Sequence, residues 1–172
     1  MKKISIVASC YNEAENLPEL YGQLTQVMKE FEGKYTYEII LADNNSTDRT
    51  PEILRGLAEK DKRVKVIFNS RNFGPDRSGY NATMQAFGDA VVTMASDLQN
   101  PPAMIRDFIA KWEQGYKIIM TVKTSSQESF IMHFLRTLYY KTLANLSAVK
   151  LVPHFTGFGM YDQQVIEMLR GL

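Results

Sequence analysis

Residues 91–102 read VVTMASDLQNPP, an apolar run that leads directly into Asp97, Gln99 and a double proline. The run is typical of a buried strand, and side chains two apart on a strand point the same way, so Asp97 and Gln99 are expected to share one face. Pro101 and Pro102 end the strand and suit the first turn of a helix, because proline cannot donate to a sheet ladder. The stretch predicts two oxygen ligands for a hard cation. The alternative for Asp97 is a helix or turn cap.

Apolar runs and helical stripes alternate along the rest of the chain. The expected strands cover residues 4–9, 37–42, 64–68, 90–95 and 116–122. The expected helices between them cover 17–31, about 50–58, 74–87 and 102–112, where apolar residues recur at helical spacing. Five strands joined by four helical crossovers predict an α/β fold, with a mainly parallel sheet and helices on both faces.

The composition is that of an ordinary globular domain, with 172 residues of which 45% are hydrophobic and 23% charged. A formal charge of +1 gives no global attraction to nucleic acid or membrane, so no nucleic-acid partner is expected. The single cysteine, Cys10, excludes an internal disulfide and is expected to fill the core. No apolar run reaches eighteen residues and the start is too short for a signal peptide, so a cytoplasmic location is expected.

Polar and mostly acidic residues follow the predicted strands. Ligands of an open parallel sheet bind beyond the carboxyl ends of the strands, where this sequence collects Glu13, Asp43, Asp48 and Asp97. Clustered carboxylates repel one another unless a cation or hydrogen-bond donors offset them, so this edge is expected to bind a ligand. A sugar nucleotide with a divalent metal would meet that need. Asp48 is expected to be a helix or turn cap.

Motifs at these strand ends resemble those of the inverting, family-two glycosyltransferases, which have the Rossmann-like GT-A fold. The motifs are YNE at 11–13, DNNSTD at 43–48, RNFG at 71–74, GD at 88–89 and DLQNPP at 97–102. The last of them, together with TGFGMY at 156–161, is most similar to the branch of dolichyl-phosphate and polyprenyl-phosphate glycosyltransferases. The resemblance implies a nucleotide-sugar-binding core over 1–123 and an acceptor-side segment of the same domain over 124–172, truncated at its C-terminal end.

The resemblance also implies roles for individual residues. Glu13 is expected near the ribose, and Asp43 is expected to accept the imino hydrogen of the base, which uracil fits better than guanine. Asp97 corresponds to the second acid of the metal motif and is the expected catalytic residue; with Gln99 it would ligate Mg2+ or Mn2+. Ala95 replaces the first acid, which weakens the expected metal dependence. The residues expected to bind the nucleotide are Tyr11, Asn12, Glu13, Asp43, Asn45, Arg71, Asn72, Gly74 and Ser96.

The acceptor side is expected to carry basic groups. The resemblance implies that Lys123 and Arg136 contact phosphates, with solvated surface as the alternative. An alcohol acceptor would need a general base, whereas a lipid phosphate is already an anion. The only acid between Glu128 and Glu167 is Asp162, which is expected to cap a helix. The resemblance implies a hexosyltransferase that uses a UDP-sugar and a polyprenyl phosphate in cell-envelope glycan synthesis, with a glycan as the alternative acceptor, and the lack of a further acid in this segment agrees with a phosphate acceptor.

Residues 129–161 contain no acid and carry apolar residues at helical spacing. A helix with one apolar and one basic side can lie in a membrane surface, which predicts contact with the inner face of the membrane; a core helix is the alternative. For the whole chain, a dinucleotide-dependent oxidoreductase would need a glycine-rich first turn, which residues 9–13 lack. A sugar-nucleotide-binding module without turnover is the alternative that Ala95 leaves open.

Overall fold

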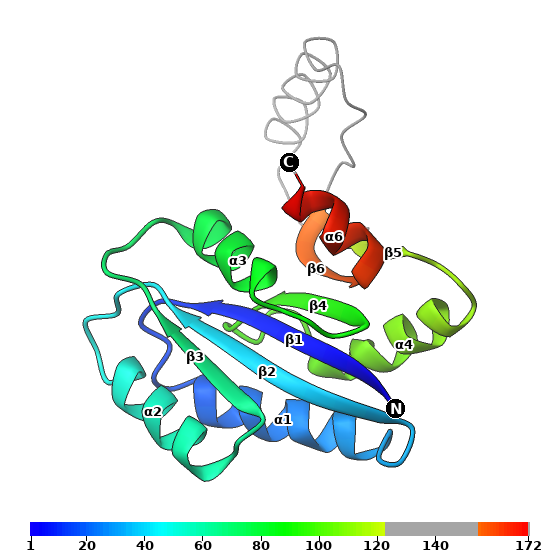
Figure 1. The fold of residues 1–172 in the computed structure, drawn as a ribbon. Helices are drawn as coiled ribbons and strands as arrows, with labels where there is room; N and C mark the ends of the chain where they lie inside the picture. The colour runs from blue at the N-terminus through cyan, green and yellow to red at the C-terminus, as the bar shows by residue number, and fades with distance from the viewer. Residues whose placement is uncertain (123–154, 172) are drawn as a thin grey trace, which may run out of the picture. The chain divides into compact units, whose positions relative to one another are not determined.

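The structure is a computed structural model that describes residues 1–122 and 155–171. A six-stranded sheet has the order β3-β2-β1-β4-β6-β5 (Figure 1). β1 pairs in parallel with β2 and β4, and β2 with β3, whereas β4 and β6 are antiparallel. The predicted mainly parallel α/β sheet is thus confirmed. The strands are β1 (Lys2–Cys10), β2 (Tyr35–Asp43), β3 (Val64–Phe68), β4 (Ala90–Ala95), β5 (Ile118–Val122) and β6 (Phe155–Asp162).

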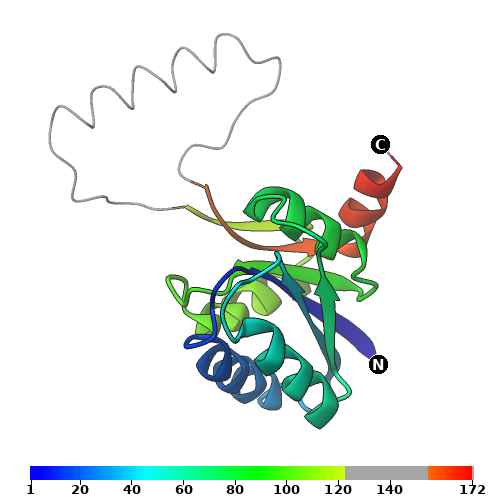
Figure 2. The same ribbon diagram turned by 90° about the vertical axis from the view of Figure 1, so that its left-hand side faces the viewer.

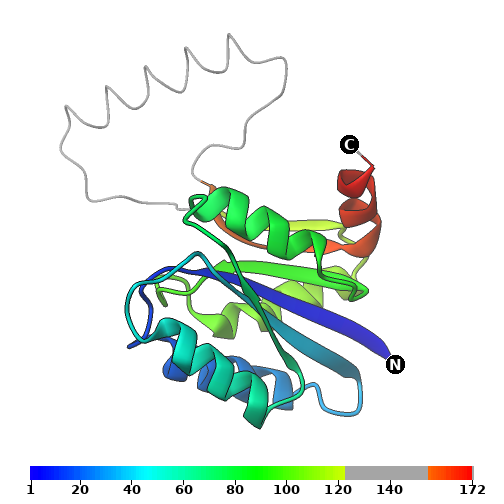
Figure 3. The same ribbon diagram turned by 60° about the vertical axis from the view of Figure 1, so that its left-hand side comes forward.

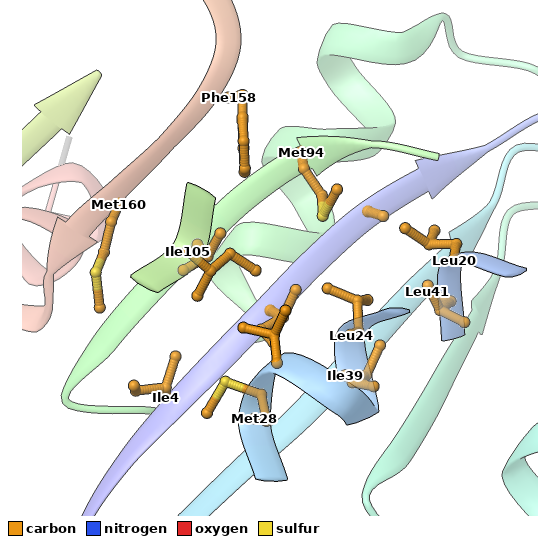
Figure 4. Close-up of a cluster of buried hydrophobic side chains, with 14 of the residues drawn as sticks. Ile4, Leu20, Leu24, Met28, Ile39, Leu41, Met94, Ile105, Phe158 and Met160 are labelled. Atoms are coloured by element: carbon orange, nitrogen blue, oxygen red, sulfur yellow. The ribbon is translucent and has the colours of Figure 1, made fainter. Parts of the chain in front are cut away.

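Helices cover both faces of the sheet, as the sequence predicts (Figures 2 and 3). On one face the apolar sides of α1, α2 and α4 pack against β1 and β2, with Leu24 and Ile105 among the buried residues (Figure 4). On the other face Ala82 of α3 and Ile166 of α6 pack against Val91 of β4. The helices are α1 (Leu17–Lys29), α2 (Thr50–Lys60), α3 (Pro75–Met84), the 3-10 turn η1 (Pro102–Met104), α4 (Ile105–Glu113) and α6 (Gln163–Arg170).

The strand β6 is absent from the sequence prediction. It contains Gly157 and Gly159, and glycine is disfavoured in strands because it has no side chain to pack. Pairing with β4 stabilises it, with Met160 opposite Val92, and the Phe158 ring packs edge-on against Phe108 of α4. The strand therefore depends on partners that are distant in sequence, which local periodicity does not reveal.

The chain divides into two compact units, one of Met1–Ile119 with Gly157–Leu172 and one of Met120–Thr156. The predicted boundary at residue 123 and the assignment of 124–172 to the acceptor stay predictions. Lys123, Arg136 and most of the apolar, basic segment 129–161 lie outside the described residues. Among the helices that the structure describes, none is long and apolar enough to cross a membrane.

A buried polar network near the amino ends of the strands joins β1, β2 and β3. Ser5 Oγ donates to Glu38 Oε1 at 2.7 Å, and the ammonium groups of Lys3 and Lys65 both lie 2.6 Å from Glu38 Oε2. The backbone N–H of Gly88 donates to Ser5 Oγ at 2.9 Å. A Cβ at Gly88 would lie 2.7 Å from the backbone nitrogen of Ser5, so this position accommodates glycine alone. The GD motif at 88–89 thus has a structural explanation.

Candidate functional site

A cleft of about 280 Å3 lies at the carboxyl edge of the sheet. The strand order reverses around β1, which has β2 on one side and β4 on the other. In α/β sheets, ligands bind in the crevice outside the strand ends at such a reversal. The cleft contains five of the predicted site residues: Tyr11, Glu13, Asn72, Ser96 and Asp97. Its other lining residues are Ser9, Asn44, Pro75 and Ala95.

Asp97 lies on the cleft, but the strand before it ends earlier than the sequence predicts. β4 ends at Ala95, and Leu98 has a φ of 58°, a left-handed conformation that interrupts the alternation of side chains. Gln99 is exposed and does not line the cleft, so the expectation that Asp97 and Gln99 share one strand face is wrong. Asp97 Oδ1 accepts the Gln99 backbone N–H at 3.1 Å. Asp97 Oδ2 accepts no hydrogen bond from the described residues.

The donor set for a divalent cation is small. Within residues 1–122 and 155–171, no three side chains of His, Cys, Asp or Glu gather closely enough to hold a metal ion. Ala95 is exposed on the cleft wall, where the family motif would supply an acid. Asp97 and Glu13 are the carboxylates that line the cleft. Mg2+ is usually held by one or two carboxylates together with substrate phosphates and water, so this set fits a cation that binds along with a diphosphate.

The loops after β1 and β2 are joined by hydrogen bonds that occupy Asn12. Asn12 Oδ1 accepts the Thr47 backbone N–H at 2.8 Å, and the Asn12 N–H donates to Ser46 Oγ at 2.9 Å. Asn12 has a φ of 55°, a conformation that asparagine tolerates well. It is absent from the cleft lining. These contacts give Asn12 a structural function, which is to hold its neighbours Tyr11 and Glu13 at the cleft.

Asp43 and Asn45 lie beside the cleft and are absent from its lining. Asp43 is 3% exposed, and its carboxylate oxygens accept the Ser46 N–H at 3.2 and 3.4 Å. Asn45 is exposed and has a φ of 62°. Asp48 Oδ1 accepts the Thr50 N–H at 2.9 Å, so the predicted cap is confirmed. The roles of Asp43 and Asn45 toward a nucleotide stay predictions.

Asn44 lines the cleft and is missing from the sequence prediction. It is 2% exposed, and its Oδ1 accepts the Phe73 backbone N–H at 2.9 Å and Asn69 Nδ2 at 3.3 Å. Its Nδ2 donates to Asn72 Oδ1 at 2.8 Å. Asn44 therefore joins the loop after β2 to the loop after β3. The DNN sequence signals an amide here, but hydrogen bonds with the loop after β3 determine how Asn44 is oriented.

The loop after β3 carries Arg71 and Gly74, both predicted to bind the nucleotide. The Arg71 guanidinium lies 4.6 Å from the centroid of the Phe73 ring, and Arg71 is exposed. Gly74 has a φ of 84° and directly precedes α3, a conformation that side chains disfavour. Neither residue is among those that line the cleft, so their contacts with a nucleotide stay predictions.

Two buried ionisable side chains have structural functions. Burial raises the pKa of Cys10 to about 12, so its thiol stays protonated and fills the core as expected. Burial disfavours the charged form of Asp162, but hydrogen bonds from Trp112 Nε1 (2.7 Å), the Gln164 N–H (3.1 Å) and Lys117 Nζ (3.0 Å) hold its pKa below the usual range. Asp162 caps α6 as predicted, and a carboxylate with these partners is a poor base.

A larger hollow of about 790 Å3 lies at the opposite edge of the sheet, beside the first residues of β2. Its lining includes Met28, Tyr35, Tyr37 and Arg63, and none of the predicted site residues. Arg63 is paired with Asp61 at 2.8 Å. Five of the predicted site residues therefore line the smaller cleft, and none of them lines the larger hollow.

Comparison with known proteins is consistent with this architecture. The sequence model described as glycosyl transferase family 2 matches residues 5–169. Undecaprenyl-phosphate 4-deoxy-4-formamido-L-arabinose transferase of Yersinia pestis (strain Pestoides F) is 34% identical over 163 residues, which are 94% of this chain and 46% of that protein. The mannosyltransferase PcManGT from Pyrobaculum calidifontis, in complex with GDP-Man and Mn2+, has a TM-score of 0.64 at 21% identity, covering 98% of this chain and 46% of that one. S. aureus TarS 1-349 in complex with UDP-GlcNAc has a TM-score of 0.62 at 20% identity, covering 98% and 47%.

The strand order defines an α/β protein with a cleft at the carboxyl edge of its sheet, and the structural likeness identifies the fold as GT-A. The family match over almost the whole chain shows that the chain belongs to glycosyl transferase family 2. The chain spans about half the length of the curated relatives it matches.

Proposed function

We propose that this chain is the nucleotide-sugar-binding part of an inverting glycosyltransferase, with a UDP-sugar preferred over a GDP-sugar as donor. The observation that carries the proposal is the cleft at the reversal of strand order, which Asp97 lines together with Tyr11 and Asn72 and where Asp97 Oδ2 accepts no hydrogen bond from the described part of the chain. A planar base suits the exposed ring of Tyr11, and a diphosphate suits a cation held by Asp97. Structural relatives in complex with UDP-GlcNAc or with GDP-Man and Mn2+ support a donor of this class.

The chemistry follows from the charge that develops during transfer. As the glycosidic bond breaks, the leaving diphosphate becomes more negative, and a bound divalent cation would stabilise that charge. Asp97 is the residue proposed to hold the cation, and Glu13 is proposed to orient the ribose. Attack from the face opposite the diphosphate gives the product with inverted anomeric configuration. Because Ala95 supplies no carboxylate, Asp97 carries the larger share of cation binding in this proposal.

The proposed acceptor is a polyprenyl phosphate, in cell-envelope glycan synthesis at the inner face of the membrane. Asp162, the one acid between Glu128 and Glu167, is bonded to Trp112 and Lys117 and is unsuited to deprotonating an alcohol. An acceptor that is already an anion needs no such base. The name of the Yersinia pestis relative, undecaprenyl-phosphate 4-deoxy-4-formamido-L-arabinose transferase, supports this choice. Lys123 and Arg136 are proposed to contact the phosphates.

Calorimetry tests the donor site. The 172-residue chain is titrated with UDP, GDP and NAD, each with and without Mn2+, and the titration is repeated with Asp97→Ala and with Asp107→Ala, an exposed acid in the first turn of α4. We expect Mn2+-dependent binding of UDP that Asp97→Ala weakens more than tenfold, about 1.4 kcal/mol, and Asp107→Ala leaves unchanged. Binding of NAD alone, or equal affinity in Asp97→Ala, would contradict the proposal. Nucleotide binding without sugar transfer would favour a binding module.

A further inference from the structure

The amides of Asn44 and Asn72 have a fixed orientation on the cleft wall. A backbone N–H can only donate, so the Phe73 N–H identifies the Oδ1 atom of Asn44 as the end that accepts, at 2.9 Å. In the same way, the Gly74 N–H donates to Asn72 at 2.8 Å and identifies its Oδ1. Asn44 Nδ2 donates to that same Asn72 oxygen at 2.8 Å. Turning either amide over would place donors against donors.

In this orientation the side-chain amides of Asn44 and Asn72 can offer a ligand N–H donors but no free acceptor. Asn72 Nδ2 has no acceptor among the residues that the structure describes, and Asn44 Nδ2 uses one of its two N–H groups. Both amide oxygens are occupied, because Asn44 Oδ1 also accepts from Asn69 Nδ2 at 3.3 Å. Asn69 in turn donates to Ser78 Oγ at 2.9 Å, which anchors the set to α3.

A flat aromatic surface lies in the same cleft. Tyr11 lines the cleft and is 45% exposed. The Asn44 backbone N–H donates to the Cys10 carbonyl at 2.8 Å, so Asn44 lies beside the residue that precedes Tyr11. A planar ring stacked on Tyr11 would therefore have its polar edge within reach of the amide pair. Asp97 and the adjacent Ser96 line the cleft as well and leave room for charged groups of the ligand.

We propose that Asn44 is a positioning residue that holds Asn72 as a hydrogen-bond donor, and that this pair selects a base with an oxo group at position 4 of a pyrimidine or position 6 of a purine over a base with an amino group at that position. The inference rests on the proposed nucleotide site. The O4 atom of uracil or the O6 atom of guanine accepts a hydrogen bond from Asn72 Nδ2, and cytosine and adenine carry an amino group at that position. The amino group of cytosine or adenine meets a second donor and loses a partner, which costs roughly tenfold or more in affinity.

The test uses two matched pairs of nucleoside diphosphates, UDP with CDP and GDP with ADP. Their dissociation constants are measured by calorimetry for the wild-type chain, for Asn72→Asp and for Asn81→Asp, the same substitution at an exposed site on α3. In the wild type we expect ratios of roughly ten or more in favour of UDP over CDP and of GDP over ADP. Asn72→Asp replaces the donor by an acceptor, so both ratios should fall at least tenfold, while Asn81→Asp should leave them unchanged. The added negative charge repels both members of a pair equally and cancels in the ratio.

Asn44→Ala tests the positioning function separately. Without Asn44 Nδ2 the oxygen of Asn72 keeps only the Gly74 N–H as a partner, so the amide turns more easily and the UDP to CDP ratio should fall although Asn72 is intact. The wild-type ratios of dissociation constants, UDP against CDP and GDP against ADP, test the selectivity for the base even if a variant does not fold. Equal affinities within each pair, or ratios that Asn72→Asp does not change, would overturn the inference and leave the nucleotide site standing. Failure of the wild type to bind any of the four nucleotides would overturn the proposed function itself.

Discussion

Replacing Glu38 by glutamine tests how the sheet that carries the cleft is stabilised. Glu38 is 2% exposed in the middle of β2, and its carboxylate contacts Ser5 of β1 together with the ammonium groups of Lys3 and Lys65. Glutamine keeps the shape of the side chain and can still accept the Ser5 hydrogen bond. The variant Glu38→Gln therefore removes the charge while the packing is largely kept.

The expected loss follows from the pKa of Glu38. Burial disfavours the charged form, but hydrogen bonds from Lys3, Lys65 and Ser5 outweigh it and lower the pKa from 4.5 to about 2. At about 1.4 kcal/mol per pH unit, this difference corresponds to about 3 kcal/mol of stabilisation at neutral pH. The side chains of Lys3 and Lys65 are 35% and 54% exposed, so both ammonium groups regain water in the variant. We therefore expect Glu38→Gln to lower the free energy of unfolding by about 2–3 kcal/mol.

Urea unfolding followed by circular dichroism measures this loss across pH. Because the folded-state pKa lies below the unfolded one, the contribution of Glu38 is complete above about pH 4.5 and is lost as the pH falls toward 2. The difference between wild type and Glu38→Gln should be full at pH 7 and shrink below pH 4.5. The control is Glu52→Gln, whose carboxylate is 70% exposed and pairs with Arg49 at 3.4 Å; its change should stay below about 0.5 kcal/mol. A loss as small as that of the control, or one independent of pH, would refute the reasoning.

Three further predictions concern the sheet, the cap of α6 and the cleft. Gly88→Ala places a Cβ 2.7 Å from the backbone nitrogen of Ser5 in β1 and should lower the free energy of unfolding by about 1–3 kcal/mol. In the control Gly22→Ala, the added Cβ on α1 has no neighbour within 4 Å, so the free energy of unfolding should rise. Equal effects of the two substitutions in urea unfolding would contradict the close packing at Gly88. Trp112→Phe removes the 2.7 Å hydrogen bond to Asp162 and should raise the pKa of that carboxyl in an NMR titration, and an unchanged pKa would count against the contact. Ala95→Asp adds a carboxylate to the exposed cleft wall and should tighten UDP binding only when Mn2+ is present; calorimetry that finds no gain would argue against a cation in the cleft.

The sequence predicts the parallel strands β1, β2 and β4 well because each has a buried apolar run of its own, as residues 90–92 of β4 do. It also predicts Asp97 as a cleft residue. The expectation that Gln99 shares a strand face with Asp97 is wrong, because the left-handed φ of Leu98 turns the chain where an extended strand is expected. The sequence prediction misses Asn44, because hydrogen bonds from a loop that is distant in sequence, including the Phe73 N–H, determine its orientation. The orientation of Asn44 and the strand β6 both depend on residues that are distant in sequence, so local sequence patterns do not predict them.

A crystal structure of this chain with UDP and Mn2+ tests the central claim most directly, because the smaller cleft and the larger hollow, both lined by described residues, lie at opposite edges of the sheet. We predict that the nucleotide occupies the smaller one, with its base beside Tyr11 and Asn72 and its diphosphate joined through Mn2+ to Asp97. The larger hollow beside Tyr37 should remain free of nucleotide. A nucleotide bound there, or a diphosphate that makes no contact with Asp97 directly or through the cation, would contradict the account.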